Sequence, residues 1–159
     1  MRTLTLLAVL LASPLWAQTP RFTPAGVDNA TLDRYLRSIV DEVGGRAGAW
    51  EFDYLDVPML MVTDEAAGRM RIMAPVADAA SLDDAERKRL LEANFHSALD
   101  ARYALWNGAL WSLYIHPMAG MNRPAFEDAL EQVAALMRNF GTTYSSTEVH
   151  FSVPSDPEP

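Results

Sequence analysis

The chain has 159 residues, no cysteine and a formal net charge of −8. This length suits one domain, and the absence of cysteine excludes disulfides and thiolate metal sites, so an apolar core must supply the stability. The acidic balance excludes a protein with the basic surface that nucleic acids and anionic membranes attract.

The N-terminus has the pattern of a secretory signal. Arg2 supplies a positive charge, residues 4–12 (LTLLAVLLA) are apolar but too short to span a bilayer, and Ala17 is a small residue before a cut. We expect a signal peptide over residues 1–17 and an exported, periplasmic protein; a retained anchor is the alternative. Without Arg2 the chain keeps 12 basic and 21 acidic residues, a net charge of −9. We expect a flexible leader over 18–27, one domain over 28–151 and a disordered tail over 152–159.

The first expected element is a helix that begins at Asp28 or Asn29 and ends at Gly44-Gly45. Its apolar residues recur at helical spacing and form one stripe: Leu32, Tyr35, Leu36, Ile39, Val40 and Val43.

Strand patterns follow over residues 49–54, 57–64 and 69–76, and short loops between them predict antiparallel pairing. Ser81 resembles the start of a capping box for a helix that ends near Asn94 or Phe95. Asn122 caps a last helix that Gly141 closes, and a short extra strand over 147–151 fits the alternation there. The expected fold is an α+β two-layer domain of order α-β-β-β-α-β-β-α with an antiparallel five-stranded sheet.

Asn107-Gly108 lies between apolar runs and is a strong hairpin signal, because a type I′ turn needs two positive φ angles. A two-residue loop places Trp106 and Trp111 each opposite an alanine, which predicts that both rings are in the core. The alternate face holds Tyr103, Tyr114 and His116 and is interpreted as plain surface, a dimer seam or a partner site.

The residues of the hairpin formed by 57–64 and 69–76 also alternate between two faces. Leu60, Val62, Met70 and Ile72 are expected to form one apolar set. Methionine adapts to varied apolar partners and arginine is enriched at interfaces, which makes the alternate set a candidate binding surface. The alternative is that its methionines pack under a loop or helix. The candidate partner-binding residues are therefore Met59, Met61, Arg69, Arg71, Met73, Tyr103, Tyr114 and His116.

Patterns for catalysis are missing from the sequence. No two of the three histidines have helical i, i+4 spacing, and no phosphate loop or nucleophile elbow is found. We expect a protein that is not an enzyme and needs no metal or cofactor. A small hydrolase that uses His96 or His116 is the third-ranked hypothesis.

Residues 90–117 (LLEANFHSALDARYALWNGALWSLYIHP) resemble the middle of the type III secretion chaperone-like superfamily, which includes the Tir-chaperone group and YbjN-type domains. The resemblance rests on Leu90, Leu91 and Asn94, the strand at 103–105, Asn107-Gly108 and the strand at 110–115. It implies the element order given above, a homodimer, and binding of an extended polypeptide without catalysis. The leading hypothesis is an exported, chaperone-like or regulatory protein-binding domain. The alternative is a structural, envelope-associated homodimeric subunit.

Overall fold

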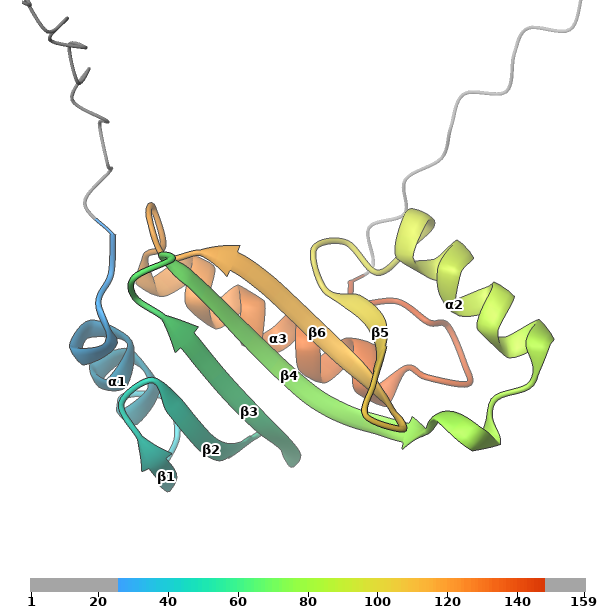
Figure 1. Cartoon of the computed structure of the whole chain (residues 1–159), viewed down its shortest axis with the longest axis horizontal. Helices are drawn as coiled ribbons and strands as arrows, with labels where there is room; N and C mark the ends of the chain where they lie inside the picture. Colours follow the sequence, from blue (N-terminus) through green and yellow to red (C-terminus); the bar gives the residue numbers. More distant parts are fainter. Residues whose placement is uncertain (1–25, 148–159) are drawn as a thin grey trace, which may run out of the picture.

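The computed structural model describes residues 26–147, which form three α-helices, a short 3-10 helix and a six-stranded sheet (Figure 1). In chain order the elements are α1 (Asn29–Arg37), β1 (Val43–Arg46), β2 (Ala49–Tyr54), β3 (Val57–Asp64), β4 (Arg69–Asp78), η1 (Ala79–Ser81), α2 (Asp84–His96), β5 (Arg102–Trp106), β6 (Ala109–Pro117) and α3 (Arg123–Arg138).

The strands are antiparallel in the order β1-β2-β3-β4-β6-β5. α1 and α3 pack on the same face of this sheet, where the Tyr35 and Phe126 rings meet at 6.1 Å. Figure 1 shows α3 behind β4 and β6, with α2 beside the edge strand β5. The α+β two-layer class is confirmed, and no helix of residues 26–147 covers the opposite face of the sheet. None of the helices in this range is long and apolar enough to cross a membrane.

The helices begin at side-chain caps. Asp28 accepts a hydrogen bond from the backbone N–H of Thr31, and Asn122 accepts one from Ala125. α2 has a reciprocal capping box between Asp83 and Glu86, so its cap lies two residues after the expected Ser81.

The sheet has six strands where five were expected, because residues 43–46 form β1 rather than the end of the first helix. α1 stops at Arg37, and the pattern after it is not helical. Gly45 has a φ of +81°, and a Cβ there would lie 2.2 Å from the carbonyl oxygen of Ala49. The glycine is therefore needed for the close approach of β1 to β2, which a sequence pattern cannot distinguish from a helix stop. The expected signal peptide, the tail and all but the first residue of the extra strand lie outside the described residues, as does all but the end of the leader.

The pairing of β3 with β4 corrects the expected apolar sets. Met61 is opposite Ile72 and both are fully buried, whereas Leu60 is opposite Met73 on the other face. The four-residue connection (65–68) changes the register by one from the expected arrangement, and a shift of one residue exchanges the faces of a strand.

The β5–β6 hairpin forms as expected at Asn107-Gly108, but its faces are reversed. Trp106 is 64% exposed, whereas Tyr103 and Tyr114 are buried against α3. The Tyr103 hydroxyl donates a hydrogen bond to the Leu136 carbonyl (2.8 Å), and the Ser112 hydroxyl donates one to the Val133 carbonyl (3.0 Å). Because the helix carbonyls satisfy these hydroxyls, their burial carries little desolvation penalty. The prediction that both tryptophans are in the core is therefore wrong.

Candidate partner-binding surface

The sheet face that α1 and α3 leave uncovered, here the open face, carries an apolar band across the four strands β3, β4, β6 and β5. The register places Leu60 beside Met73 and Met73 beside Leu113 in one row. Ile115, at 52% exposure, lies in the next row. Monomeric proteins rarely expose connected apolar surface of this kind without a role for it. The band comprises Leu60, Val62, Met73, Pro75, Trp106, Trp111, Leu113 and Ile115.

A hollow of about 950 Å³ runs from the β1–β2 end of the sheet to Trp111, and we call it the open-face groove. Pro75 and Ala77 pair with consecutive residues of β6, so β4 has a bulge between them. A bulge bends and twists its strand and tolerates proline, and this places Pro75 and Trp111 at one end of the groove.

The other end of the open-face groove is acidic. Its lining includes Asp41, Glu42, Glu51 and Asp53, and no lysine or arginine. None of these four carboxylates forms an ion pair with another residue of the described chain. Unpaired carboxylates in a concave surface concentrate negative potential there, so the groove combines an apolar end with a cation-attracting end.

The candidate residues from the sequence divide between surface and core. Arg69, Arg71 and Met73 lie on the open face, and His116 is partly exposed near the end of β6. The other four, Met59, Met61, Tyr103 and Tyr114, are buried and do not offer their side chains to a partner. Their proposed contact role is corrected to a core role. The helices cover the hairpin face that carries Tyr103 and Tyr114, and the β3–β4 register places Met59 and Met61 on the buried face.

Sequence reasoning missed the most exposed apolar residues of the open face, Trp106 and Ile115. Their signal was present in the hairpin alternation, which correctly grouped both with Trp111 and Leu113. It did not show which group the helices cover, because that depends on the distant residues of α3.

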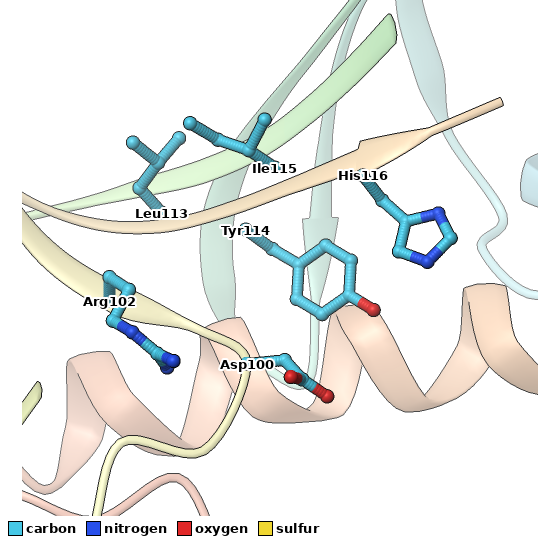
Figure 2. Close-up of a pocket in the computed structure, with 6 residues that line it drawn as sticks. All are labelled: Asp100, Arg102, Leu113, Tyr114, Ile115 and His116. Atoms are coloured by element: carbon cyan, nitrogen blue, oxygen red, sulfur yellow. The ribbon is translucent and has the colours of Figure 1, made fainter. Parts of the chain in front are cut away.

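A second hollow, of about 350 Å³, lies beside β6 where β5 has not yet begun (Figure 2). We call it the β6 slot; it is lined by Asp100, Arg102 and the four residues from Leu113 to His116. Leu113 and Ile115 point to one side of β6, whereas Tyr114 and His116 point to the other, toward Asp100 and α3. Burial, reinforced by the carboxylates of Asp100 and Asp128, raises the pKa of Tyr114, so its phenol stays protonated at neutral pH.

The free edge of β5 is closed by α2 rather than by another strand. The Asn94 amide donates to the Tyr103 carbonyl (3.0 Å), and its oxygen accepts from the Tyr103 N–H (2.7 Å). The side chain thus substitutes for a neighbouring strand. On the outer side of α2, Leu91 and Phe95 are 71% and 66% exposed, and they form a separate apolar patch.

Within residues 26–147 no group of three or more His, Cys, Asp or Glu side chains is arranged to hold a metal ion. Every fully buried side-chain nitrogen or oxygen in this range has a hydrogen-bond partner. The two candidate histidines have different neighbours: His96 contacts the Phe95 ring, and His116 stacks on Tyr114.

No protein-family model matches the sequence, and no curated protein does. The solved structures that contain a chain of the same fold include two complexes. One is the crystal structure of the ExsC–ExsE complex, with a TM-score of 0.54 and 14% identity, covering 72% of this chain and 97% of that chain. The other is the structure of the HopA1–SchA chaperone–effector complex, with a TM-score of 0.52, 12% identity and the same coverages of 72% and 97%. The fold is therefore shared with a chain of a chaperone–effector complex, and this agrees with the chaperone-like α+β fold that the sequence resemblance implied.

Proposed function

We propose that this protein is a chaperone-like, non-enzymatic domain that binds an extended segment of another polypeptide across its open face. The observation that carries the proposal is the open-face groove, which joins Trp111 and Leu60 to the carboxylates of Glu51 and Asp53. The fold supports the proposal, because a protein of similar structure is part of a chaperone–effector complex. An extended chain that alternates its side chains suits a flat, twisted sheet surface.

The charge of the groove specifies the chemistry of the partner. Its carboxylates favour lysine or arginine side chains, and its apolar end favours an aliphatic or aromatic anchor beside them. Covering the exposed Trp106 of the open face also removes apolar surface from water, at about 25 cal/mol per Å². The preferred ligand is therefore a cationic, amphipathic segment in extended conformation.

The test is a fluorescence titration with a twelve-residue peptide that alternates arginine and leucine. The Glu51→Gln/Asp53→Asn variant is expected to bind about tenfold more weakly, because each lost surface attraction is worth up to about 1 kcal/mol. Asp84→Asn/Glu92→Gln removes the same charge from α2 and serves as the control. Equal affinities of the two variants would contradict a role for the groove.

We also place this function after export, in the periplasm, on the basis of the signal-like residues 1–17. An intact mass that corresponds to a start near Gln18 in protein purified from the envelope of its host is the expected result. An uncleaved N-terminus would contradict it. We include the YbjN-type resemblance in the same proposal. Export distinguishes the proposed role from that of a secretion chaperone.

A homodimer is the second candidate arrangement, and the exposed Leu91 and Phe95 on α2 favour it. Leu105, which is 52% exposed on the neighbouring edge strand, extends this patch. Light scattering of the Leu91→Asp/Phe95→Asp variant is expected to give a monomer mass where the unmodified protein gives a dimer. A monomer in both would eliminate the structural, dimeric subunit.

A further inference from the structure

The β6 slot contains a strand edge of β6 that no other described strand pairs with. β6 pairs with β4 as far as Pro117, but its pairing with β5 ends at Leu113. Residues 114–117 therefore pair with β4 on one side. On the other side, no strand within residues 26–147 pairs with them. Such an edge accepts an added strand, because its peptide groups lack partners there.

The hairpin register identifies which peptide groups face the slot. A two-residue loop makes Trp106 and Ala109 a hydrogen-bonding pair, and the period of two carries this pattern to Arg102 and Leu113. The N–H and C=O of Ile115 therefore point toward the unpaired edge. Leu113 and Ile115 add an apolar wall on one side of it (Figure 2).

The chain leaves the described structure beside this slot. Ser146 donates its backbone N–H to the Ser97 carbonyl (3.1 Å) and its hydroxyl to the Ala98 carbonyl (2.6 Å). Ala98 is two residues before Asp100, which lines the slot, and two extended residues span at most about 7 Å. The residues after Thr147 therefore start within a few residues' reach of the Ile115 edge.

The residues that follow have a strand pattern. Val149, Phe151 and Val153 alternate with Glu148, His150 and Ser152 in the sequence. In a strand, alternation places these three apolar side chains on one face, as it places Leu113 and Ile115 on one face of β6.

We infer that residues 148–153 dock in the β6 slot as an additional strand that runs parallel to β6 from the Arg102 end toward Pro117. The apolar side chains of Val149 and Phe151 then extend the apolar wall at Ile115, and the segment pairs with the peptide groups of Ile115. A tethered segment reaches an effective concentration of about millimolar, which favours it over a free strand at micromolar concentration. This self-complementation concerns a different part of the sheet from the open-face groove and does not depend on the proposed function.

Amide hydrogen exchange measured by NMR on the full chain tests the inference. In Val149→Asp/Phe151→Asp the Ile115 amide is expected to exchange about tenfold faster than in the unmodified chain, because its partner is lost. Ser155→Asp, which adds one charge beyond the strand, is expected to leave the rate unchanged. The Leu60 amide, in the middle of β3, reports whether each variant keeps its fold.

Two results would overturn the inference. Equal Ile115 exchange in the unmodified chain and the double variant, with Leu60 protected in both, would show that the segment does not occupy the slot. Protection of Ile115 that rises with protein concentration would show that a second copy occupies it instead.

Discussion

Trp111 donates its indole N–H to the backbone carbonyl of Trp106 at 3.1 Å, and the two rings lie 6.0 Å apart at 53°. This bond links the two strands of the β5–β6 hairpin on the side that the helices leave uncovered. It also satisfies the one polar group of the Trp111 ring, so that the rest of the ring is available for apolar contact. The pair thus presents a fixed aromatic surface rather than two independently moving side chains.

Met61 and Met73, two of the four methionines of the β3–β4 hairpin, are expected to respond differently to substitution by glutamate. Met61 is fully buried, whereas Met73 is partly exposed on the open face. Met61→Glu is expected to lose more than about 3 kcal/mol of unfolding free energy, and Met73→Glu less than about 1 kcal/mol. Urea unfolding followed by circular dichroism measures both. Equal losses would contradict the register that separates the two side chains.

Asn94 is expected to be a stability determinant because it closes the β5 edge through Tyr103. Asn94→Ala leaves a partly buried N–H and C=O without their partner, at about 1–3 kcal/mol. Glu92→Ala, on the same helix and in a surface ion pair with Lys88, is the control and is expected to cost less than about 1 kcal/mol. Urea unfolding gives both values, and faster exchange of the Tyr103 amide would locate the effect. Similar losses in the two variants would remove this role.

The bond from the Trp50 indole to Asp33 (2.9 Å) predicts a pH dependence of stability. The Arg37 side chain and then the Trp50 indole, both hydrogen-bonded to Asp33, lower the pKa of its carboxyl group. A lowered folded pKa stabilises the protein above the unfolded pKa of about 4, and this contribution is lost as pH falls through the folded pKa. Asp33→Asn should therefore narrow the stability difference between pH 6 and pH 3, as should Trp50→Phe to a smaller degree. Unchanged pH dependence in Asp33→Asn would contradict the assignment.

Much of the fold follows from local signals in the sequence. Asn107-Gly108 sets a turn, Asn122 caps α3, and the limits of β2 and β3 coincide with the alternating runs. The strand β1 was missed because the Gly44-Gly45 pair within it, which lets β1 approach β2 closely, also resembles a helix stop. Local chemistry is ambiguous at such a pair, and the tertiary pairing with β2 decides it.

The sequence predicts which strands form the candidate site, but it does not predict which face of the sheet the helices cover. Both hairpins do form the open face, and Arg71 and Met73 are on it as expected. The alternation places Tyr103 on a face that is interpreted as plain surface, a dimer seam or a partner site. Its hydroxyl instead donates a hydrogen bond to the Leu136 carbonyl of a helix that begins 20 residues later in the chain. Which face is dry is a long-range property, and alternation alone does not contain it.

The most direct test of partner binding at the open face is an NMR titration of the ¹⁵N-labelled protein with the arginine–leucine peptide. We expect the amide chemical shifts of Glu51, Leu60 and Trp111 to change and those of α2 to stay unchanged. We also expect added salt to weaken binding, because the attraction is partly electrostatic. Absence of binding at millimolar peptide, or changes confined to α2, would contradict it.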